Sequence, residues 1–257
     1  MNIVVCIKAV PSRANNPAIV EGGQKIRVDS PQWLFNESDE YALEEALSLK
    51  KNFRGSVTVI TVGPIHAQEV LYSSVARGAD KAIRVDADEF DPNIVAYLLS
   101  RAINKLTYDV ILTGVESSDG MSSQVGISLA TELALPYAYA VTKVEAASDL
   151  KSLIVERELG GGSYQTLEIT LPALFCIQSG IARLTYTPVA KLFQARRSGA
   201  QCFTLRDLGL DSEQLKDRRK TTIVEILQRE KSNRTQMLTG NPAEIAHFIF
   251  EKIKEAG

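Results

Sequence analysis

The chain alternates between short apolar runs and longer segments in which apolar residues recur every three or four positions. Short runs rich in β-branched residues predict buried strands, whereas the three-to-four spacing predicts amphipathic helices. The predicted strands are residues 2–8, 55–63, 81–86 and 108–114. The predicted helices are residues 38–51, 65–78, 91–106 and 122–133. Their alternation predicts a doubly wound α/β fold, in which a mostly parallel sheet carries helices on both faces.

Residues at the helix ends support these assignments. Asp91 is expected to cap the helix that Pro92 begins, since proline at the first helical position loses no hydrogen bond. Gly78 can end the preceding helix in the left-handed conformation. A final helix over residues 241–255 has the same start, with Asn241 as its cap.

The pattern changes after the fourth predicted helix. Residues 137–146, 152–159 and 164–171 read as antiparallel strands, with a glycine turn at residues 160–162. Residues 172–178 predict one more core strand. The sheet is therefore expected to have an antiparallel extension.

From about Thr187 the chain is expected to be irregular and basic until the final helix. We therefore expect an α/β domain over residues 1–186. An arm and a C-terminal extension with the helix would form residues 187–257.

Composition excludes several classes of protein. The hydrophobic content of 45% and the charged content of 23% are typical of a globular chain. A net charge of −2 gives no field that would attract nucleic acid or an acidic membrane. No apolar run approaches the ~20 residues that span a bilayer, so no membrane insertion is expected. The start of the chain reads as a strand rather than a signal peptide, and three scattered cysteines fit a reducing cytoplasm.

A polar, glycine-containing stretch, TGVESSDGMSSQVG at residues 113–126, joins a predicted buried strand to a predicted helix. Ligands of open parallel sheets bind beyond the carboxyl ends of the strands, where the N–H groups of a helix start favour phosphate. The candidate ligand-binding residues in this stretch are Gly114, Asp119, Gly120, Ser122, Ser123 and Gln124. The stretch matches neither common phosphate-binding fingerprint. It is equally typical of a plain helix start capped by serine and aspartate.

Two other predicted strand ends would lie beside this stretch. Asn36 offers the amide donor and acceptor that adenine recognition needs, although a turn or cap role suits it as well. Gly63 and Pro64 end another strand tightly. With two histidines, no paired carboxylates and no nucleophile beside a base, we expect neither catalytic nor metal-ligating residues. The sequence indicates a nucleotide binder rather than an enzyme.

Five blocks of sequence extend this interpretation: NESDEYALEEALSLK, VGPIHAQEVLYSSVARGADKAIRV, GVESSDGMSSQVGISLATELALP, VERELGGG and LPALFCIQSGIARLTYTP. In this order they resemble the electron transfer flavoprotein beta subunit, and the resemblance covers about residues 1–197. TLRDLGL and the final helix continue it.

The resemblance implies an alpha–beta heterodimer whose redox FAD is held mainly by the alpha subunit. The beta subunit of this family binds AMP, or a second FAD in electron-bifurcating members. Electrons arrive from a partner dehydrogenase and leave to a quinone oxidoreductase or another acceptor. The chain would therefore be an electron carrier subunit that depends on partner enzymes. Residues 1–186 would bind the nucleotide, and residues 187–257 would recognise the partner and pack on the alpha subunit.

The family's motifs also locate site residues in this chain. They place the nucleotide at residues 114–125, ending at Val125, and at Cys6, Asn36, Glu37, Ser38, Asp39 and Ala67. Two positions depart from the family pattern. Glu37 stands in place of a proline, which makes that turn less rigid. Glu116 stands in place of a glutamine and adds a negative charge near the phosphate, which should weaken binding unless the side chain points away.

The family's partner-recognition segment corresponds to TYTPVAKLFQARR, where the usual Pro-Arg-Tyr is replaced by Leu184-Thr185-Tyr186. We expect its apolar residues to insert into a dehydrogenase while its basic residues favour an acidic surface. The candidate partner-binding residues are Tyr186, Val189, Leu192, Arg196 and Arg197, with Lys191 adding charge. The alternative is a solvated basic arm.

The resemblance leaves the identity of the second nucleotide open. Met121, Ser122 and Ile127 depart from the pattern of bifurcating members, which favours AMP over a second FAD. A stand-alone adenine-nucleotide-binding module is a further alternative, but it would have little use for the basic arm and the C-terminal extension.

Overall fold

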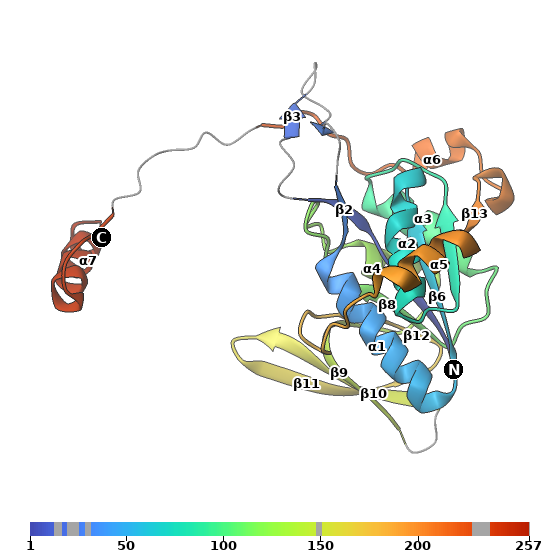
Figure 1. Cartoon of the computed structure of the whole chain (residues 1–257), viewed down its shortest axis with the longest axis horizontal. Helices are drawn as coiled ribbons and strands as arrows, with labels where there is room; N and C mark the ends of the chain where they lie inside the picture. Colours follow the sequence, from blue (N-terminus) through green and yellow to red (C-terminus); the bar gives the residue numbers. More distant parts are fainter. Residues whose placement is uncertain (13–16, 20–25, 29–31, 148–150, 228–236, 257) are drawn as a thin grey trace. The chain divides into compact units, whose positions relative to one another are not determined.

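The computed structural model describes residues 1–12, 17–19, 26–28, 32–147, 151–227 and 237–256 (Figure 1). The chain forms two compact units: Met1–Ala18 with Arg27–Ile223, and Ile19–Ile26 with Val224–Gly257. The second unit contains helix α7 (Pro242–Ala256), whose Glu244 N–H donates to Asn241 Oδ1 at 3.0 Å, as the predicted cap requires. Among the helices of the described residues, none is long and apolar enough to cross a membrane.

The first unit is built on one large sheet. Its strands are β1 (Asn2–Cys6), β6 (Ser56–Val62), β7 (Lys81–Val85), β8 (Val110–Gly114), β9 (Tyr137–Ala146), β10 (Ser152–Gly160), β11 (Ser163–Thr170), β12 (Ala173–Ile177) and β13 (Gln201–Phe203). Their order is β11-β10-β9-β12-β8-β1-β6-β7-β13. In the part of this order that runs β9-β12-β8-β1-β6-β7-β13, every pair of neighbouring strands is parallel. β10 pairs antiparallel with both β9 and β11. The predicted mostly parallel sheet with an antiparallel extension is confirmed.

Helices cover both faces of this sheet. They are α1 (Glu37–Phe53), α2 (Gln68–Arg77), α3 (Pro92–Ile103), α4 (Val125–Glu132), α5 (Val189–Ser198) and α6 (Ser212–Arg218), with 3₁₀ turns η1 (Ile65–Ala67) and η2 (Arg206–Leu208). Ile3 and Val5 of β1 belong to a buried cluster with residues of α1 and α2. Val4 and Cys6 belong to a second cluster with residues of α3 and α4. Alternate residues of a strand point to opposite faces, so the central strand is buried on both.

Short strands β2 (Ala9–Pro11), β3 (Pro17–Ile19), β4 (Ile26–Val28) and β5 (Trp33–Phe35) lie outside the large sheet. β2 pairs antiparallel with β5, between the end of β1 and the start of α1. No alternating pattern in the sequence predicted this two-stranded sheet.

Two predictions of secondary structure were wrong. The segment after Thr187 is not irregular, because α5 forms there and β13 joins the edge of the large sheet beside β7. Basic residues interrupt the apolar face of α5, which hid its helical spacing. The helix predicted from residue 122 begins only at Val125, since Ser123 has a φ of 53°, a left-handed conformation that an α-helix excludes.

Asp91 caps α3 as predicted and also fixes the segment that follows α6. Its side chain, which is fully buried, accepts hydrogen bonds from the N–H groups of Asn93 (2.8 Å), Lys220 (2.9 Å) and Thr221 (2.7 Å). Burial would raise the pKa of Asp91, but hydrogen bonds from Thr221, Lys220 and Asn93 outweigh it and lower the pKa to about 2.

This cap predicts a loss of stability in acid. The pKa of Asp91 is lower in the folded chain than in the unfolded chain, so its contribution is complete above about pH 4 and disappears as the pH falls towards 2. The contribution is about 2 kcal/mol near neutral pH. Urea unfolding of the wild type and of Asp91→Asn between pH 2 and 7 should show the difference in free energy of unfolding narrowing below pH 4. A constant difference would contradict the prediction.

Candidate functional site

The carboxyl ends of β1 and β8 form the switch point of the sheet. From β1 the chain builds towards β6 and β7 on one side, and then returns to place β8 on the other side of β1. Crevices at such points are the usual ligand sites of doubly wound sheets. Cys6 ends β1 and Gly114 ends β8, so both predicted site residues lie at this point.

The buried carboxylate of Asp39, in the first turn of α1, joins these two strand ends. Its Oδ2 accepts from the Lys8 backbone N–H at 2.8 Å, and its Oδ1 accepts from the Gly114 N–H at 2.9 Å. A Cβ at Gly114 would lie 2.5 Å from Asp39 Oδ1 and 2.5 Å from Ser38 Oγ, so only glycine allows this approach. Burial raises the pKa of Asp39 to about 7, against the opposing effect of these hydrogen bonds.

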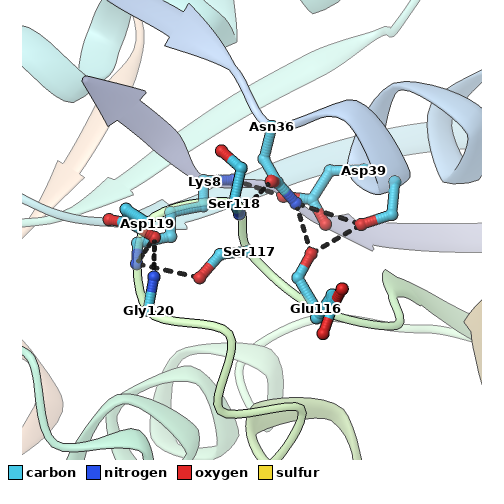
Figure 2. Close-up of polar contacts among 9 residues, drawn as sticks. Lys8, Asn36, Asp39, Glu116, Ser117, Ser118, Asp119 and Gly120 are labelled. Atoms are coloured by element: carbon cyan, nitrogen blue, oxygen red, sulfur yellow. Dashed lines mark hydrogen bonds and ion pairs between the residues drawn. The ribbon is translucent and has the colours of Figure 1, made fainter. Parts of the chain in front are cut away.

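Asn36 holds the backbone of the polar loop that follows β8 (Figure 2). Its side chain is only 2% exposed; Nδ2 donates to the Glu116 carbonyl at 2.8 Å and Oδ1 accepts from the Ser118 N–H at 3.0 Å. Ser38 Oγ donates to the same Glu116 carbonyl at 2.6 Å. Asn36 occupies the N-cap position of α1 but makes no cap hydrogen bond. Its amide donor and acceptor are therefore both used to position the loop.

Lys8 fastens the tip of the same loop. Its ammonium lies 2.7 Å from Asp119 Oδ1 and donates to Ser117 Oγ at 3.2 Å (Figure 2). Asp119 Oδ1 also accepts from the Gly120 N–H at 2.8 Å. Burial would raise the pKa of Asp119, but the charge of Lys8 and these hydrogen bonds outweigh it and lower the pKa. Nothing in the sequence indicated this role for Lys8 beyond its place directly after a buried strand.

The start of α4 shows whether side chains of the loop cap this helix. Gln124 is the N-cap residue and makes no side-chain cap hydrogen bond. Asp119 is engaged with Lys8, and Ser123 Oγ donates to Glu116 Oε2 at 3.0 Å. In the part of the chain that the structure describes, no side chain caps the first turn of α4. The loop therefore does not form a helix start that is capped by its own side chains. The N–H groups of the first turn are available to an anion.

The remaining predicted residues make none of the hydrogen bonds described above. Cys6 is buried in the cluster on the α3 and α4 face, and burial raises the pKa of its thiol. Ala67 is buried against Gly63, where a Cβ on the glycine would lie 2.8 Å from Ala67 Cβ. Glu37, Ser122 and Gln124 are exposed. Val125 is the first residue of α4.

A second surface lies at the start of α5. Tyr186, Val189 and Phe193 are 79%, 57% and 58% exposed, and Val189 and Phe193 are one turn apart on the helix. Leu192, another of the predicted partner-binding residues, is half-buried. The sequence did not distinguish Leu192 from its neighbour Phe193, because both fit an apolar face.

The segment before α5 is fixed to α1 and α2. Thr185 donates through N and Oγ1 to the carboxylate of Glu44 at 3.1 and 2.8 Å. Arg77 Nε donates to Thr187 Oγ1 at 2.8 Å, and Arg77 also pairs with Glu40 at 2.8 Å. These hydrogen bonds hold the segment that leads into α5, and so they fix the position of the exposed apolar residues.

The basic residues of α5 differ in their surroundings. Arg196 forms an ion pair with Glu69 of α2 at 2.6 Å. Arg197 is exposed and has no ion pair among the described residues. Residues of α2 and α5 line a pocket of about 290 Å³, with Lys191 and Gln194 among them.

The fold and the site define a doubly wound α/β protein with a preformed polar loop at its switch point. A family model described as "Electron transfer flavoprotein domain" matches residues 26–201. The chain is 32% identical to the electron transfer flavoprotein subunit beta of Methylophilus methylotrophus, over 99% of this chain and 98% of that protein. It is 32% identical to the Bacillus subtilis subunit beta with the same coverage, and 34% identical to protein FixA of Azotobacter vinelandii over 84% of this chain and 79% of that protein. The chain belongs to the electron transfer flavoprotein family, among its beta subunits.

Proposed function

We propose that this chain shuttles electrons, together with an alpha subunit that holds the redox FAD, from a partner dehydrogenase to a quinone oxidoreductase or another acceptor. In this proposal the chain itself binds AMP at the switch point as a structural ligand. The AMP would stabilise the folded subunit by mass action and take no part in the redox chemistry.

The uncapped start of α4 is the observation that carries the AMP proposal. Free N–H groups at Val125 and Gly126, with the exposed side chains of Ser122 and Gln124, have the donor chemistry that a phosphate needs. Asn36 and the Asp39 carboxylate are assigned to positioning this loop. Cys6, Ser38, Ala67, Gly114 and Gly120 would border the nucleotide.

The residues after Thr187 are assigned to partners. In this proposal Tyr186, Val189 and Phe193 contact the dehydrogenase. The half-buried Leu192 packs α5 onto the rest of the chain. Arg196 and Arg197 add positive charge. The exposed apolar residues of α7, Ile249, Phe250 and Ile253, would pack on the alpha subunit.

Nucleotide content tests the proposal directly. The chain is co-purified with its alpha subunit, the complex is denatured, and the released FAD and AMP are quantified by chromatography. We expect one FAD and one AMP per heterodimer. Two FAD and no AMP would place a second redox cofactor at the switch point and make electron bifurcation the leading mechanism. A stable monomer that releases only an adenine nucleotide would instead indicate a stand-alone binding module.

A further inference from the structure

The loop after β8 carries two carboxylates, Glu116 and Asp119. Each accepts a hydrogen bond, but among the described residues only one of the two negative charges has a positive partner. Asp119 faces the Lys8 ammonium at 2.7 Å, so its charge is balanced by an ion pair. Glu116 Oε2 accepts at 3.0 Å from Ser123 Oγ, which is neutral. Glu116 is exposed and forms no ion pair within the described part of the chain. One uncompensated negative charge therefore lies at the start of α4.

The position of this charge matters because Ser123 directly precedes the N-cap of α4. A hydroxyl there could donate to a phosphate oxygen, but it donates to Glu116 instead. The φ of 53° at Ser123 sets the backbone that holds this contact. The Glu116 side chain thus points towards the proposed phosphate site, not away from it, while its carbonyl is fixed by Asn36 and Ser38.

We propose that Glu116 is an internal competitor of the nucleotide phosphate and so determines the specificity of this site. The inference rests on the proposed function. The carboxylate occupies the Ser123 hydroxyl and repels a phosphomonoester, which carries close to two negative charges at neutral pH. The site therefore binds AMP more weakly than its backbone geometry allows, and it prefers AMP over the uncharged nucleoside adenosine by a small factor only.

The test compares the affinities of AMP and adenosine by titration calorimetry. The full chain is used with its alpha subunit after removal of bound nucleotide, as wild type and as Glu116→Gln. Removing one unit charge at short range should tighten AMP binding by about three- to tenfold and leave adenosine within about twofold. The gain for AMP should shrink from 0.02 M to 0.5 M salt, because ions screen the repulsion. Glu116→Ala should give the same direction if the charge, rather than a new amide contact, is responsible.

Glu213→Gln is the matched control, since it makes the same charge change at an exposed residue of α6. It should leave the ratio of the AMP and adenosine affinities unchanged. Equal tightening of both ligands by Glu116→Gln would show that the residue acts on the shape of the loop, and would overturn the inference. An unchanged AMP affinity would also overturn it. If the wild type bound neither AMP nor adenosine, the proposed nucleotide site would be wrong, and the inference about Glu116 with it. This result differs from the two above, in which the wild type binds and only the inference about Glu116 is wrong.

Discussion

Replacing Asp39 by alanine should lower the free energy of unfolding by about 4 kcal/mol at pH 5 and by about 2 kcal/mol at pH 8. The substitution leaves the N–H groups of Lys8 and Gly114 without their acceptor in a buried site. Each such loss costs about 1–3 kcal/mol. Because these donors also fix the start of the loop, AMP affinity should fall at least about tenfold, the effect of displacing a binding loop from its bound geometry.

The pH dependence has a definite sign. Burial raises the pKa of Asp39 to about 7, above its value in the unfolded chain. Its contribution to stability is therefore complete below about pH 4 and decreases as the pH rises through 7. The loss caused by the alanine substitution should be larger at pH 5 than at pH 8. Urea unfolding of both proteins at the two values of pH measures it.

Asp80→Ala is the control for this prediction. Asp80 Oδ2 also accepts a backbone hydrogen bond, from Val57 at 2.8 Å, but at the amino edge of the sheet where β6 and β7 begin. This variant should lose stability without any change in AMP affinity beyond about twofold, because the loop is intact. Equal AMP affinities for Asp39→Ala and the wild type would contradict the positioning role of Asp39.

The sequence predicted the place of the candidate site in the fold better than the contacts that its residues make. Periodicity located β1, β8 and α1, and the rule for open sheets placed Asn36 beside the loop. The family resemblance added Asp39. The contacts among them could not be predicted, because they join residues far apart in the chain. Lys8 and Asp119, for example, are 111 positions apart, and nothing near either residue marks the other as its partner.

The surface of α5 shows a different limit of sequence reasoning. A helix next to a sheet buries only part of its apolar residues, and the exposed ones follow from its rotation about its own axis. Leu192 and Phe193 are neighbours with similar character, so only the structure separates the half-buried residue from the exposed one. The same applies to Arg196 and Arg197, of which only Arg196 is paired, with Glu69.

Replacing Phe193 by alanine should slow reduction of the heterodimer by its dehydrogenase about tenfold or more, the size expected for an aromatic anchor at an interface. Phe193 and Val189 form an exposed apolar patch one turn long, next to Tyr186. Exposed aromatic residues on a rigid base lose little conformational entropy on binding, and α5 has such a base in the contacts of Thr185 and Thr187. Stopped-flow measurement of flavin absorbance gives the rate of reduction.

Leu192→Ala is the matched comparison in the same helix. Because Leu192 is half-buried, Leu192→Ala should lower the thermal stability of the chain more than Phe193→Ala does. Leu192→Ala should slow reduction of the flavin by less than about threefold. Neither variant should change AMP content, since both residues lie outside the loop after β8. Arg197→Gln should weaken the salt dependence of the rate, whereas Arg196→Gln should change it less because Glu69 already balances that charge. A wild-type rate for Phe193→Ala would remove α5 as the docking surface and leave the alternative of a solvated basic helix.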